Sequence, residues 1–230
     1  MTPDALATAM EATWPPAAAW LDGPWRLRDG AGGGKRVSAA TPEAGWTEDD
    51  IALAEAAMPA ALFMIRPQDA ALDAALQKRG YARVDPVVIY AAATAGSAPP
   101  PRMTTFPHWP PLQVAADIWA EGHIGPARLA IMHRASGPKT AILARACDRA
   151  AGVAFVALHG TTAMLHALEV SLPYRRQGCA RNILSAAALW ARDHGAATLA
   201  LAVTEANQGA RALYASQGMQ GVGQYHYRQK

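Results

Sequence analysis

The chain has little of what several special classes of protein need. Its two cysteines, Cys147 and Cys179, are too few for a disulfide framework and lack metal-ligand spacing. No apolar run is long enough to span a bilayer. Asp4 and Glu11 precede the first basic residue, Arg26, so we expect no signal peptide. These absences predict a cytoplasmic protein that uses no metal.

Charge is also scarce. Charged residues make up 17% of the 230 residues, the formal net charge is +3, and the basic residues are scattered rather than clustered. This distribution argues against nucleic acid or a membrane surface as the main partner. The hydrophobic fraction of 51% is enough for one large or two small cores. The sequence gives no oligomeric state.

A segment rich in alanine and proline, residues 93–102, has the composition of a linker. It separates an N-terminal lobe, residues 1–92, from a larger lobe, residues 103–230. In the first lobe we expect helices at 47–57 and 70–79, and strands at 25–28, 36–39 and 62–65.

The second lobe begins with a helix expected from Pro110 or Pro111 to Ala120. Strands at 140–147, 152–159 and 162–170 follow, joined by tight turns at 148–151 and 160–161. After them we expect a helix that ends at His194, a strand at 198–203 and a helix that runs from an N-cap at Asn207 to Gly218. This order predicts an α/β fold with a mixed sheet.

The turn after strand 162–170 carries the motif Arg-x-x-Gly-x-Ala, residues 175–180. A helix opens directly from this turn, so main-chain N–H groups and the helix dipole would favour an anion there. Gly178 lets the backbone approach that anion, and Ala180 keeps the start of the helix slim. The pattern suits a diphosphate.

The same turn is followed, one strand later, by Asn-x-x-Ala-x-x-Leu-Tyr-x-x-x-Gly at residues 207–218. The two motifs in this order resemble the GNAT superfamily of N-acetyltransferases, although Met219 stands where phenylalanine is usual. The resemblance implies the GNAT fold and acetyl-coenzyme A as the acyl donor. It also implies direct transfer to a primary amine of a small molecule, peptide or protein within a ternary complex.

The resemblance further assigns the cofactor contacts. Main-chain N–H groups of residues 176–181 would hold the diphosphate, residues 168–170 the pantetheine arm, and the Val170 N–H the thioester carbonyl. The full set of expected cofactor-binding residues is Leu168, Glu169, Val170, Arg175, Arg176, Gln177, Gly178, Cys179, Ala180, Arg181 and Asn207.

Two side chains are candidates for catalysis. Tyr214 would donate a proton to the leaving thiolate, because a phenol with a pKa of about 10 stays protonated near neutrality. The alternative is a tyrosine that only packs at a helix end. His166 would accept the amine proton, or else is a histidine hydrogen-bonded within the sheet. Strand alternation places His166, Leu168 and Val170 on one face and Glu169 on the other.

A weak internal repeat appears when Gly80 is aligned with Gly218. It suggests that the N-terminal lobe is a shortened, degenerate GNAT-like domain without a cofactor turn, which shapes the acceptor pocket or braces the sheet. An unrelated small α/β cap is the alternative. A different function also stays open, namely a coenzyme A-binding sensor or interaction module without turnover.

Overall fold

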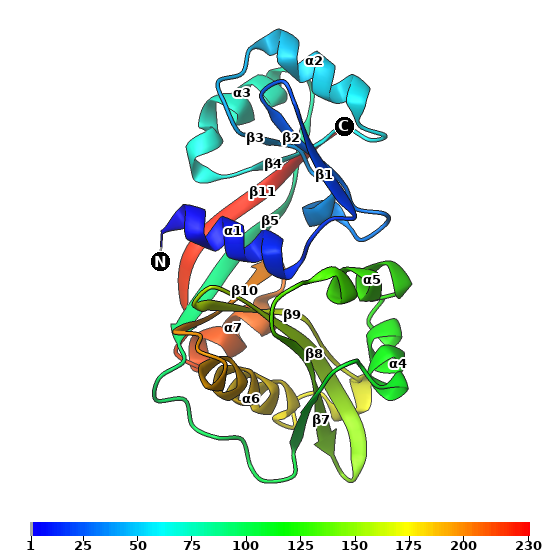
Figure 1. Cartoon of the computed structure of the whole chain (residues 1–230), viewed down its shortest axis with the longest axis vertical. Coiled ribbons are helices and arrows are strands. Elements are labelled where there is room, and N and C mark those ends of the chain that lie inside the picture. The colour runs from blue at the N-terminus through cyan, green and yellow to red at the C-terminus, as the bar shows by residue number, and fades with distance from the viewer. Residues whose placement is uncertain (1) are drawn as a thin grey trace. The chain divides into compact units, whose positions relative to one another are not determined.

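The structure is a computed structural model that describes residues 2–230 as two compact units (Figure 1). Unit 1 comprises the chain up to Pro15 together with residues 90–202 and 212–220, and unit 2 comprises residues 16–89, 203–211 and 221–230. The N-terminal segment belongs to unit 1, and the C-terminal segment belongs to unit 2. The lobes 1–92 and 103–230 remain a prediction.

Unit 1 is built on a mixed sheet with the strand order β5-β10-β9-β8-β7-β6. Strand β10 runs parallel to β9, whereas β9, β8, β7 and β6 pair antiparallel. Its elements are α1 (Pro3–Thr13), β6 (Thr105–His108), α4 (Gln113–Glu121), α5 (Pro126–Arg134), β7 (Lys139–Ala146), β8 (Arg149–His159), β9 (Thr162–Val170), α6 (Cys179–Asp193), and parts of β5 (Ala82–Ala93), β10 (Thr198–Thr204), α7 (Gln208–Ser216) and β11 (Gln220–Gln229).

Helices cover both faces of this sheet. On one face Gly152 of β8 leaves room for Ile183 of α6. On the other face Phe155 packs against Trp14, which follows α1, with ring centroids 6.1 Å apart. Positions 152 and 155 are three residues apart in a strand, so they lie on opposite faces. The predicted mixed α/β fold is thus confirmed, with β9 spanning the predicted residues.

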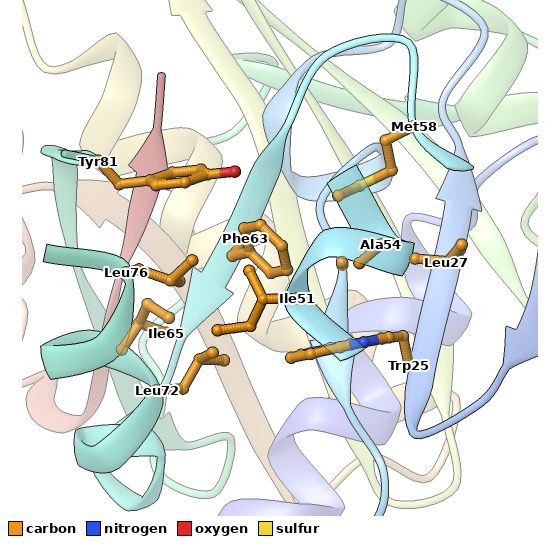
Figure 2. Packing of buried hydrophobic residues seen from close by; sticks show 11 residues of the cluster. Trp25, Leu27, Ile51, Ala54, Met58, Phe63, Ile65, Leu72, Leu76 and Tyr81 are labelled. Carbon is orange, nitrogen blue, oxygen red and sulfur yellow. The ribbon is translucent and has the colours of Figure 1, made fainter. Parts of the chain in front are cut away.

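Unit 2 has a smaller sheet, β1-β2-β3, and the strand order β4-β11-β5. Its other elements are β1 (Ala18–Asp22), β2 (Trp25–Asp29), β3 (Thr41–Pro42), α2 (Glu48–Ala57), β4 (Leu62–Ile65) and α3 (Ala70–Lys78). Figure 2 shows its core, in which side chains from α2, α3, β2 and β4 meet around Phe63. The rings of Trp25 and Phe63 lie 5.4 Å apart, edge to face.

Several expected elements differ from the structure. The strand expected at 36–39 is instead a 3-10 turn, η1 (Lys35–Val37), because Gly34 has a φ of 101° and the Ala39 N–H bonds back to the Lys35 carbonyl. Helices α1 and α5 were not anticipated. Pro126 opens α5 at its first turn. The turn between β7 and β8 lies at residues 147–148 rather than 148–151.

Among the described residues, no helix is both long enough and apolar enough to cross a membrane.

Candidate active site

The Arg-x-x-Gly-x-Ala turn presents a row of main-chain N–H groups. A 3-10 turn, η3 (Leu172–Tyr174), leads from β9 to Gly178, the N-cap of α6, which has a φ of 86°. Arg176 is also left-handed, with a φ of 63°. Such residues turn successive N–H groups toward one side and form a concave anion site.

These N–H groups have no acceptor within residues 2–230. The N–H groups of residues 176–181 donate to no carbonyl, whereas the next one, of Asn182, donates to the Gly178 carbonyl at 2.9 Å. The first N–H groups of a helix always lack an intrahelical partner, and here the turn adds more of them. Residues 176–178 are exposed. The turn thus meets the requirement of the predicted diphosphate site, an accessible cluster of unused donors.

The Arg175 side chain is engaged within the protein. Its Nε donates to the Val170 carbonyl at 3.0 Å, and its Nη2 forms an ion pair with the Glu169 Oε1 at 3.0 Å. The guanidinium therefore braces the end of β9 against the turn. The side chain is thus used within the protein, and its expected contact with the cofactor stays a prediction.

Strand β9 contains one more residue than the matching part of β8. His166 lies opposite Phe155, but Glu169, three residues later, lies opposite Val153, only two residues earlier. The structure therefore has a β-bulge at Ala167, which has a φ of 52°. The bulge was not predicted.

The bulge overturns the expected alternation of side chains. Paired residues share a face, and Val153 and Phe155 also share one, so Glu169 lies on the same face as His166. Val170, paired with Gly152, lies on the α6 face, and Leu168 follows it by alternation. Placing His166 with Leu168 and Val170 was therefore wrong, because the extra residue reverses every later position.

The Val170 N–H points away from β8. The Ser171 N–H donates to the Ala151 carbonyl at 3.0 Å, which marks these two residues as a hydrogen-bonded pair. In an antiparallel ladder the neighbouring pair, Val170 and Gly152, then directs its N–H and C=O groups outward.

On the side away from β8, strand β10 pairs with only the first part of β9. The pairing with β10 joins residues 198–201 to residues 162–165 and stops there. Beyond Leu165, the part of β9 that reaches Val170 therefore has no strand partner on its outward side within unit 1, where the Val170 carbonyl accepts from Arg175. An extended arm such as pantetheine needs an edge of this kind in order to add itself as a strand.

Tyr214 lies on α7 and is 5% exposed, with its ring 5.9 Å from that of Tyr90. Burial raises the pKa of Tyr214 to about 12. The phenol therefore stays protonated at any physiological pH, as a proton donor must. Packing at a helix end, the alternative from the sequence, is equally consistent with this environment.

His166 is 5% exposed beneath α1. Its Nε2 lies 2.9 Å from the Thr13 hydroxyl, and its ring lies 4.9 Å from that of Trp14. The Thr13 hydroxyl also lies 2.7 Å from the Ala9 carbonyl, so it donates to that oxygen and accepts from the histidine. The sequence alternative of a hydrogen-bonded histidine matches these contacts, and the role as a base stays a prediction. Nothing in the sequence linked Thr13 to His166, which lie far apart along the chain.

Asn207 caps α7, since its Oδ1 accepts from the Ala210 N–H at 3.1 Å. Cys179 is the first residue of α6, and burial raises the pKa of its thiol. Ala180 is half-buried and Arg181 exposed. A cavity of about 630 Å³ lies beside α6, between its polar residues Arg181, Asn182 and Ser185 and the linker segment. This volume falls in the usual range for a ligand pocket.

The acetyltransferase (GNAT) family model matches residues 103–219, just over half of the chain. The chain belongs to this family.

Solved structures agree in fold. A GCN5-related N-acetyltransferase from Kribbella flavida aligns with a TM-score of 0.72 and 15% identity, over 98% of this chain and 94% of that one. An acetyltransferase of the GNAT family from Novosphingobium aromaticivorans gives 0.61 and 14%, over 91% and 89%. A tandem GNAT protein from the clavulanic acid pathway gives 0.62 and 14%, over 96% and 86%. A comparison with curated proteins finds no match.

Proposed function

We propose that this protein transfers an acetyl group from acetyl-coenzyme A to a primary amine, by direct attack of the amine within a ternary complex. The observation that carries the proposal is the row of unused main-chain N–H groups at residues 176–181, next to the part of β9 that has no strand partner on its outward side within unit 1. The family match supports the acyl donor. The acceptor, a small molecule or a peptide or protein amine, is not encoded in any motif.

In this proposal the main chain of the turn holds the diphosphate, and the dipole of α6 adds to the attraction. The outward N–H of Val170 binds the thioester carbonyl and stabilises negative charge that develops on its oxygen. The cavity beside Arg181 and Asn182 accommodates the adenosine end. Acetyl-coenzyme A itself supplies an activated acyl group on a good leaving thiolate.

The reaction also moves three protons. An alkylammonium acceptor with a pKa of about 10.4 must lose one before attack, because it is neutral only about once in a few thousand molecules at pH 7. Its nitrogen loses a second proton as the amide forms, and the leaving thiolate gains one from Tyr214, whose raised pKa keeps it protonated and which regains its proton from the one that the nitrogen releases. We assign the first proton to His166 or to a chain of water molecules. The rate of His166→Asn distinguishes them, since only the loss of a histidine base would lower the rate about 100-fold.

The test is the release of coenzyme A thiol from acetyl-coenzyme A over a panel of amines, with Tyr214→Phe as the variant. We expect amine-dependent release by the wild type and a rate about 100-fold lower in Tyr214→Phe, the effect of losing a general acid. Tyr81→Phe is the matched control, because Tyr81 is a buried tyrosine of unit 2. It should keep the wild-type rate.

Two outcomes oppose the proposal. If the wild type binds acetyl-coenzyme A but releases no thiol with any amine, the protein is a coenzyme A-binding sensor. If it binds neither acetyl-coenzyme A nor coenzyme A, the site is not a coenzyme A site. The tandem origin of the N-terminal lobe remains a separate prediction that sequences of relatives would test.

A further inference from the structure

The bulge in β9 is held from outside the sheet. The indole Nε1 of Trp119, on α4, donates a hydrogen bond to the Ala167 carbonyl at 2.7 Å. Trp119 is fully buried, and α4 packs on β8 and β9. Gly122, the C-cap of α4, lies directly against the Glu169 side chain, so that a Cβ at this position would require the carboxylate to move. The end of α4 therefore contacts both the bulge and the residue that follows it.

The bulge residue needs such support. Ala167 has a φ of 52°, a left-handed conformation that an alanine adopts at a cost and that glycine or asparagine would adopt more easily. A bulge also leaves its extra residue outside the regular ladder. A hydrogen bond from a buried indole therefore gives the Ala167 carbonyl a partner in this conformation.

The register of β8 and β9 shows that the bulge determines the direction of the Val170 N–H. In β8, the Ala151 carbonyl accepts from the N–H of Ser171, directly after β9, and the Leu158 N–H donates to the carbonyl of Pro138, directly before β7. Between Ala151 and Leu158, odd positions therefore face β9 and even positions face β7. Without the extra residue, Val170 would lie opposite Ala151 and its N–H would point into β8. With the extra residue, Val170 lies opposite Gly152 and its N–H points outward.

We propose that Trp119 is a positioning residue that holds β9 in the register in which the Val170 N–H faces the thioester carbonyl. The inference rests on the proposed function, since it names what orients the carbonyl donor. Trp119 touches neither acyl donor nor acceptor in this account. It acts through the Ala167 carbonyl.

Amide hydrogen exchange of the unaltered, ligand-free protein tests the register directly. We expect the Val170 amide to exchange at least about tenfold faster than those of Glu169 and Ser171, which face β8. Acetyl-coenzyme A should protect the Val170 amide, and coenzyme A, which lacks the carbonyl, should not. Equal protection of Val170 and Glu169 in the free protein would overturn the proposal.

A variant tests the role of Trp119 itself. Trp119→Phe keeps an aromatic ring but removes the N–H, and we expect its preference for acetyl-coenzyme A over coenzyme A to fall about tenfold, the effect of one lost hydrogen bond. Trp190→Phe is the control, because Trp190 stacks on His194 at the far end of α6. It should keep the wild-type preference.

The outcomes separate this inference from the proposed function. If Trp119→Phe weakens both ligands equally, Trp119 only packs and the inference is wrong while the function stands. If Trp119→Phe does not fold, the exchange pattern of the unaltered protein still decides the register. If the unaltered protein binds neither ligand, the proposed function is wrong.

Discussion

Replacing Gly178 by alanine tests the anion site with a control that the same helix supplies. Gly178 has a φ of +86° and opens α6, whereas Gly195 has a φ of +87° and follows its end. At both positions an added Cβ meets nothing within 4 Å. The two Gly→Ala variants therefore carry the same backbone strain of about 1–2 kcal/mol, partly offset by the lower entropy of the unfolded chain.

Only Gly178→Ala should lower the affinity for acetyl-coenzyme A. A Cβ on Gly178 projects into the open space from which a diphosphate would approach the N–H groups of residues 176–181. Each hydrogen bond to a charged group contributes about 1.5–3 kcal/mol, so weakening one or two of them reduces affinity about 100-fold. Isothermal titration calorimetry with acetyl-coenzyme A measures this effect, and urea unfolding verifies that both variants lose similar stability. Equal affinities for Gly178→Ala and Gly195→Ala would refute the reasoning.

Three further changes test the packing around the site and in unit 2. Ala167→Gly should raise the free energy of unfolding, measured in urea, by up to about 1 kcal/mol, because glycine tolerates a φ of 52°. Ala167→Val should lower the free energy of unfolding, and a stabilising effect of valine would contradict the left-handed conformation of the bulge. Since burial raises the pKa of Tyr214 to about 12, above about 10 in the unfolded chain, its stabilising contribution is present below pH 10 and lost as the pH rises toward 12. Between about pH 10 and 12 the wild type should therefore lose stability relative to Tyr214→Phe. The same pH dependence of stability in both proteins would show that the phenol is accessible to water. Burial raises the pKa of Asp73, but hydrogen bonds from Arg228 at 2.7 Å and from His226 outweigh this effect and lower the pKa. The contribution of Asp73 to stability is therefore present above about pH 4 and is lost as the pH falls through the pKa of Asp73 in the folded state. Asp73→Asn should cost about 3 kcal/mol at pH 7 by leaving Arg228 buried without its carboxylate, and the cost should shrink in acid.

The parts of the fold that the sequence predicted are those with local signals. Strand β9 and helix α6 follow from apolar spacing, and the N-cap at Asn207 follows from a side chain that bonds three residues ahead. The turn at residues 175–180 was predictable for the same reason, because its glycine and the following helix are contiguous in the chain.

The parts that could not be predicted depend on distant contacts. Nothing local marks Ala167 as a bulge, since alanine is not a residue that signals a left-handed conformation, and the hydrogen bond from Trp119 comes from 48 residues earlier. Alternation therefore assigned Glu169 to the wrong face. Thr13 and Trp14 reach His166 from a helix that carried no expected role. Sequence spacing identifies a motif, but tertiary contacts decide which groups of that motif are exposed.

The most direct measurement is a titration of the isotopically labelled protein with coenzyme A, followed by the amide resonances of residues 176–181. These main-chain N–H groups have no acceptor within the described chain, so we expect them to show the largest and saturable shifts, with those of Gly178 and Cys179 foremost. Pantetheine, which lacks the diphosphate, should leave these resonances unshifted. Shifts confined to other parts of the chain, or none at all, would contradict the claim that this turn binds the diphosphate.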